Sequence, residues 1–71
     1  MYTFKFLYTD GSTVKCEHIK SASHAPGGGH VPEDELAKHT FLLTKDLWLF
    51  TESGSFCVSR DNLRCIKVTA E

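Results

Sequence analysis

Two strand-like runs, each folded around a glycine-containing turn, most constrain what this chain of 71 residues can fold into. The first run covers residues 2–20 and turns at Thr-Asp-Gly, residues 9–11. The second covers residues 47–59 and turns at Glu-Ser-Gly, residues 52–54. Apolar runs joined by turns of this composition are typical of β-hairpins. The chain is therefore expected to be mainly β.

The register of the first hairpin follows from its side-chain pattern. Aromatic residues occupy every second position along residues 2–8, which is the period that places them on one face of a strand. A three-residue loop with Gly11 in the left-handed conformation keeps apolar residues on that face, whereas a two-residue turn mixes them with lysines. The three-residue loop predicts three cross-strand pairs: Phe6 with Val14, Phe4 with Cys16, and Tyr2 with His18.

A single domain is expected for residues 1–71, with a small core, because a chain of this length buries only about 60% of its surface on folding. Its expected parts are an N-terminal hairpin at 1–20, a flexible Gly-rich loop at 21–32, a short helix at 33–38 and C-terminal strands within 40–71. Pro32 and the acidic residues after it favour a helix start. So short a helix needs Leu36 to pack against the sheet.

Strands are expected at 41–44, 47–51, 56–59 and 63–68, with a tight turn at 60–62. Several of these runs are continuously apolar rather than alternating. Continuous apolar character implies that both faces of the sheet are covered, or that another molecule covers one of them.

From residue 47 onward, the order of strand, glycine turn, strand, one-turn link and strand resembles the end of small SH3-like β-barrels. The resemblance is one of architecture, and fold alone implies no function. It implies a highly bent sheet with exposed edges, a scaffold used to bind peptides, nucleic acid or copies of itself. The expected fold is a small antiparallel, strongly bent sheet or SH3-like barrel of about five to six strands, with one short helix after the Gly-rich loop.

The charge balance gives no general attraction to nucleic acid or to anionic membranes, because eight Lys+Arg and nine Asp+Glu leave a formal net charge of −1. Five basic residues could gather on one side as a local basic face, but acidic and basic residues alternate along the sequence, which favours a mixed, solvated surface: Lys15, Lys20, Arg60, Arg64 and Lys67.

The expected location is the cytoplasm, with no membrane partner. No apolar run approaches the roughly 20 residues of a membrane span, and the N-terminal residues lack the pattern of a signal peptide. The three cysteines lack the regular spacing of a secreted disulfide scaffold, which favours a reducing compartment.

Candidate metal ligands are few. Thiolate and imidazole groups that suit zinc are supplied by Cys16, His18, His24 and His30. Structural zinc sites usually use closely paired ligands, whereas two of these histidines lie in the Gly-rich loop. A small zinc-binding domain is therefore only an alternative, and no cofactor is expected. No segment carries the residues of a known reaction, so the protein is expected not to be an enzyme.

The candidate interaction surface is the strand segment Leu47, Trp48, Leu49 and Phe50. Trp48 and Phe50 share one face and the two leucines share the other, so one pair is surplus to a small core unless the hairpin and the short helix bury both pairs. An uncovered edge beside them can be extended by a strand of another chain. The sequence thus predicts a non-enzymatic module that binds a protein partner or itself. The alternative from another class is a small β-barrel that binds nucleic acid.

Overall fold

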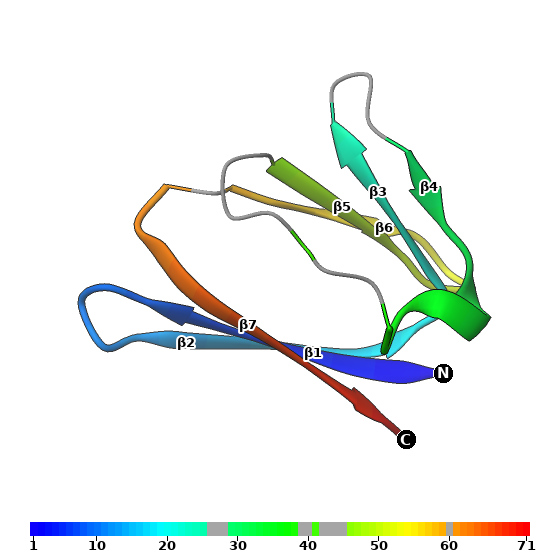
Figure 1. The fold of residues 1–71 in the computed structure, drawn as a ribbon, viewed down its shortest axis with the longest axis horizontal. Helices are drawn as coiled ribbons and strands as arrows, with labels where there is room; N and C mark the ends of the chain where they lie inside the picture. Colours follow the sequence, from blue (N-terminus) through cyan, green and yellow to red (C-terminus); the bar gives the residue numbers. More distant parts are fainter. Residues whose placement is uncertain (26–28, 39–40, 42–45, 60) are drawn as a thin grey trace.

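Seven β-strands form two antiparallel sheets in the computed structural model, which describes residues 1–25, 29–38, 41, 46–59 and 61–71. The first sheet has the order β2-β1-β7, and the second has the order β4-β3-β5-β6 (Figure 1). The sheets pack against each other but do not close into a barrel. The strands are β1 Tyr2–Tyr8, β2 Thr13–Ile19, β3 Ser21–Ala25, β4 His30–Val31, β5 Asp46–Phe50, β6 Ser55–Val58 and β7 Leu63–Ala70.

The turn of the first hairpin is the predicted one. Gly11 has φ 90°, and its N–H donates to the carbonyl of Tyr8 at 3.0 Å. The N–H of Tyr8 donates to the carbonyl of Ser12 at 3.0 Å. Two of the three predicted cross-strand pairs, Phe6 with Val14 and Phe4 with Cys16, are confirmed.

The third predicted pair is wrong, because β2 contains a bulge near its end. Tyr2 lies opposite Ile19 rather than His18, and the register shifts between Tyr2 and Phe4. His18 takes a left-handed conformation with φ 62° and is exposed, whereas Ile19 is fully buried. Strict alternation from Cys16 would place the imidazole in the core and Ile19 outside. The extra residue of the bulge turns His18 outward and Ile19 inward, so the apolar side chain is the one removed from water.

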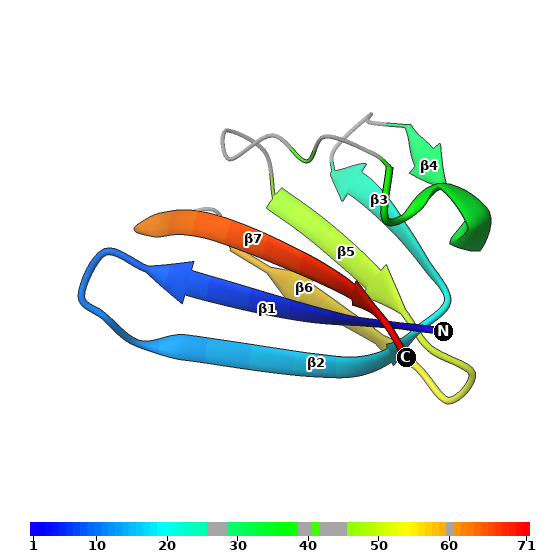
Figure 2. The same cartoon turned by 60° about the horizontal axis from the view of Figure 1, so that its bottom comes forward.

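Most of the segment expected to be a flexible loop, residues 21–32, is strand instead. β3 follows β2 after Lys20 and pairs along its length with β5, while β4 pairs with the other edge of β3. Lys20 donates its N–H to the carbonyl of Phe50 at 2.8 Å, which fixes the corner where the chain passes between sheets (Figure 2). β3 forms because β5 offers its backbone a partner and because Ala22 is buried. Residues 26–28 of this segment lie outside the described residues.

The short helix expected at 33–38 is only a 3-10 turn, η1, at Glu33–Glu35. Three consecutive acidic residues carry no apolar face, and none of them is buried. The following Leu36 is fully buried, as the docking prediction required. Of the strand predicted at 41–44, Phe41 is not in a strand, and residues 42–44 lie outside the described residues.

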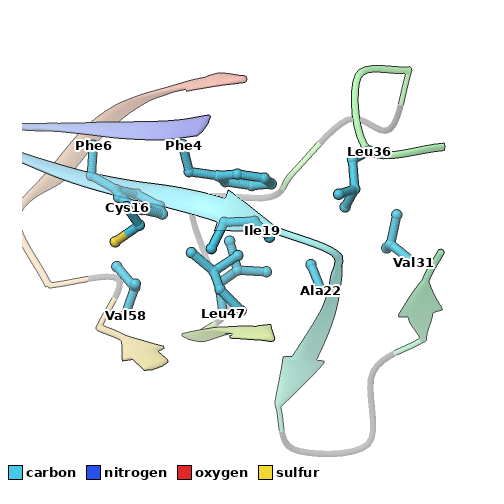
Figure 3. Close-up of a cluster of buried hydrophobic side chains, with 10 residues drawn as sticks. Phe4, Phe6, Cys16, Ile19, Ala22, Val31, Leu36, Leu47 and Val58 are labelled. Atoms are coloured by element: carbon cyan, nitrogen blue, oxygen red, sulfur yellow. The ribbon is translucent and has the colours of Figure 1, made fainter. Parts of the chain in front are cut away.

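The hydrophobic core lies between the two sheets, and Figure 3 shows the side chains that form it. Strand β1 supplies Phe4 and Phe6, whose ring centroids are 6.0 Å apart. The ring of Phe41 meets Phe4 edge-on, with centroids 5.4 Å apart. The other buried hydrophobic residues come from both sheets and from the residue that follows η1: Cys16, Ile19, Ala22, Val31, Leu36, Leu47, Leu49 and Val58.

The last three strands, β5, β6 and β7, agree with the sequence prediction in place and order. β5 and β6 form the second hairpin, and β7 pairs with β1 along most of its length. β7 extends to Ala70, further than expected, because Thr69 and Ala70 continue the ladder with Thr3 and Tyr2. The described residues form seven strands rather than five to six, since β3 and β4 lie in the segment expected as loop.

Candidate functional site

The predicted interaction segment divides between the core and the surface. Leu47 and Leu49 are buried between the sheets, with 2% and 0% exposure. Trp48 lies on the opposite face of β5 with 38% exposure, and Phe50, on the same face as Trp48, is half-buried. Only the two aromatic residues are therefore candidates for contact with another molecule, as the period of two along a strand requires.

The neighbouring strand β6 forms one edge of the second sheet. Its ladder with β5 places Cys57 beside Trp48, and Phe56 beside Leu49. Phe56 is nevertheless 47% exposed, because it lies at the margin of the core. Exposed aromatic side chains thus lie on both faces of the β5–β6 hairpin: Trp48 on the outer face of β5 and Phe56 on the inner face of β6, the edge strand.

The edge strands β2, β7 and the four-residue β6 differ in how they are protected against pairing with another chain. β2 carries Lys15, Glu17 and a bulge, and β7 carries Arg64, Lys67 and a register shift. β6 reads Ser-Phe-Cys-Val and has neither a charged residue nor a proline. Charged side chains, proline and bulges are the usual protection of sheet edges. β6 lacks all of them.

The four candidate metal ligands do not come together. Cys16 is buried in the core, and burial raises the pKa of its thiol. His24 is also buried and lies beside Phe41, with ring centroids 5.8 Å apart. His18 and His30 are exposed. Within the described ranges, no three His, Cys, Asp or Glu side chains are grouped closely enough to hold a metal ion.

His18 has another use, because the bulge is held by the carboxylate of Glu71. The backbone N–H of His18 donates to Oε2 at 2.6 Å, and Nδ1 of its ring lies 2.8 Å from Oε1. The hydroxyl of Thr3 donates to Oε2 at 3.1 Å. These hydrogen bonds, the backbone N–H of His18 first among them, lower the pKa of Glu71. The carboxylate thereby links β2 to the end of β7.

The lowered pKa of Glu71 predicts a dependence of stability on pH. A carboxyl whose pKa is lower in the folded chain stabilises the fold above its unfolded pKa, and this contribution is lost as pH falls through the folded value. We expect Glu71→Gln to be less stable than the wild type at neutral pH. The difference should shrink as pH falls below 4.5. Thermal unfolding of both proteins across this range measures it, and a difference that does not change with pH would contradict the assignment.

Three lysines form the second candidate site, which we call the lysine face. Lys5 of β1 lies directly opposite Lys15 of β2 and Lys67 of β7, and all three are exposed on the outer face of the first sheet. A surface hollow of about 350 Å³ is lined by these lysines together with Thr3 and Thr69. Lys15 and Lys67 are among the basic residues singled out from the sequence, whereas Lys5 is not. Alternation along β1 places Lys5 on the polar face, but only the pairing of β1 with β7 shows that the lysines meet.

The other basic residues named from the sequence are not among the described residues that line the lysine face. Lys20 forms an ion pair with Glu52 at 2.7 Å, and this pairing raises the pKa of Lys20. Arg64 is exposed at the register shift in β7, and residue 60 lies outside the described residues.

Comparison with known proteins does not add a family to these observations. The part of the chain that the structure describes contains no helix long and apolar enough to cross a membrane. No family model matches the chain, and neither a curated protein nor a solved structure matches it.

Proposed function

We propose that the protein is a non-enzymatic interaction module that binds a second copy of itself through the edge strand β6. The observation that carries the proposal is the unprotected character of this edge. β6 is the last strand of its sheet and has neither a charge nor a proline along Ser55–Val58. Such an edge presents backbone N–H and C=O groups that a second strand can pair with.

The side chains around β6 support binding of a strand there. A strand added to the edge would lie beside Phe56 on one face of the sheet and beside Cys57, the β6 neighbour of Trp48, on the other. Aromatic side chains with large exposed areas are the residues that most often dominate binding energy. Binding would cover the exposed side chains of Phe56 and Cys57.

A second copy is the partner that suits this edge. Two β6 strands can pair antiparallel about a two-fold axis, in which each copy presents the same surface to the other. Because β6 is uncharged, the two copies meet without electrostatic repulsion. The pairing would also enlarge a small core. Few side chains of each copy border this edge, so the interface belongs to the small class, below about 1,200 Å². We expect a weak association, with a Kd on the order of 1 μM.

Native mass spectrometry in the presence of reductant tests the proposal. At about 100 μM protein, well above the expected Kd, the wild type should appear at twice the chain mass of 8.0 kDa. Cys57→Glu places a charge on the edge and should give a monomer. Cys65→Glu is the matched control, because Cys65 is also exposed but lies on β7 of the other sheet, and it should remain a dimer. A monomeric wild type, or equal behaviour of the two variants, would overturn the proposal.

The SH3-like architecture and the cytoplasmic location remain part of the proposal. The backbone N–H of Thr9 donates to the carbonyl of Asn62 at 2.8 Å, which ties the link between β6 and β7 to the first hairpin. This link, followed by a strand that pairs with β1, supports the architecture. Cys16, Cys57 and Cys65 are free thiols, which supports a reducing compartment.

A further inference from the structure

The geometry of the lysine face points to a second binding site, one for the phosphate backbone of single-stranded nucleic acid. The site is on the first sheet, away from β6, and does not depend on the proposed self-association. Its central feature is the direct cross-strand register of Lys15, Lys5 and Lys67. Neighbouring strands are about 4.8 Å apart, so this row spans about 10 Å across the sheet.

Such a row is unfavourable in the isolated chain, because like charges directly opposite each other destabilise a sheet. Lys15 is partly compensated by Glu17, at 3.2 Å. None of the described carboxylates forms an ion pair with Lys5 or Lys67. The chain as a whole is slightly acidic, with a net charge of −1, so the row is a local concentration of positive charge. A bound anion would supply the missing counter-charge.

The hollow at the row has the chemistry of an oxyanion site. Its lining residues are three lysines and the two threonines Thr3 and Thr69, with no carboxylate among them, although the Thr3 hydroxyl already donates to Glu71. Ammonium groups and hydroxyls are common donors to phosphate oxygens in nucleic-acid complexes. No aromatic side chain lines the hollow, so bases would not stack there. Recognition would therefore be of the backbone and independent of base sequence.

An extended strand fits the row better than the other anions do. The length of the row allows successive phosphates to contact different lysines, whereas a single phosphate would leave part of it uncompensated. An anionic membrane would gain only the modest attraction of each lysine, because the hollow offers no apolar side chain to insert.

Fluorescence anisotropy with a labelled oligothymidine of about 12 nucleotides tests the site through its salt dependence. Each phosphate contact with a single strand contributes about −0.7 to the slope of log K against log salt, so three lysines predict about −2. Between 50 and 200 mM salt, the affinity of the wild type should fall about 20-fold. For Lys5→Gln, with two contacts left, it should fall only about 7-fold.

Two further variants test whether binding depends on the lysine face rather than on any exposed lysine. Lys38→Gln removes the same charge from an exposed lysine beyond η1 and should keep the wild-type slope. Glu17→Gln frees Lys15 from its ion pair and should strengthen binding at low salt. Circular dichroism should show that Lys5→Gln remains folded and at least as thermally stable as the wild type, since it removes a repulsion.

Three outcomes would overturn the inference. The first is no binding at about 20 mM salt, where electrostatic attraction is strongest. The second is the same slope for Lys5→Gln and Lys38→Gln. The third is tighter binding to inorganic polyphosphate of matched charge, or to vesicles containing phosphatidylserine, than to the oligonucleotide. A monomeric wild type that still binds in this way would overturn only the proposed self-association.

Discussion

Replacing Phe6 by alanine is expected to lower the free energy of unfolding by about 3–5 kcal/mol. Phe6 is fully buried, stacks on Phe4 and lies opposite Val14 and Ile66 in the two ladders of β1. Its removal leaves a cavity that the surrounding side chains fill only in part. A stability of about 0.05–0.15 kcal/mol per residue gives roughly 4–11 kcal/mol for a chain of 71 residues, so the substitution removes a large share of it.

Urea denaturation followed by far-UV circular dichroism measures this loss. Phe56→Ala is the control, because Phe56 is the same residue type in a half-exposed position at the sheet edge. We expect it to change the stability of the monomer by about 1 kcal/mol or less, while it weakens the proposed association. Equal losses for Phe6→Ala and Phe56→Ala would contradict the placement of Phe6 at the centre of the core.

The local parts of the fold could be predicted from the sequence. The period of two along residues 2–8 and the need for positive φ at Gly11 were sufficient to give the turn and two cross-strand pairs. The same period placed Trp48 and Phe50 on one face of β5 and the two leucines on the other. These features depend on neighbours in the chain, and their signals are strong because each is set by backbone geometry.

The parts that the sequence did not show depend on distant pairing. β3 has a small and polar composition typical of a loop, and it is a strand because β5 pairs with it. The bulge at His18 follows from the burial of Ile19, which no local pattern indicates. The lysine face needs Lys5 and Lys67, from opposite ends of the chain, to meet in the β1–β7 ladder. Local patterns therefore predicted the first hairpin but not the pairing between distant strands, and the candidate sites depend on that pairing.

The second large effect is expected at the turn of the first hairpin. Gly11→Val should destabilise the protein by about 1–3 kcal/mol, because a β-branched residue is strained at positive φ. A Cβ atom built on Gly11 meets no other atom within 4 Å, so the cost comes from the backbone conformation rather than from a clash. Thermal and urea unfolding of the variant measure it.

Gly54→Val separates this backbone effect from a general intolerance of valine in hairpin turns. Gly54 lies in the turn between β5 and β6, and a Cβ there is also clear of other atoms within 4 Å. Of the described glycines, only Gly11 has positive φ, so valine at Gly54 should cost much less. The two hairpins look alike in sequence, yet their turns place different demands on the backbone. If both valine variants were equally destabilised, steric or packing effects would have to explain the loss, and the left-handed conformation of Gly11 would not be its cause.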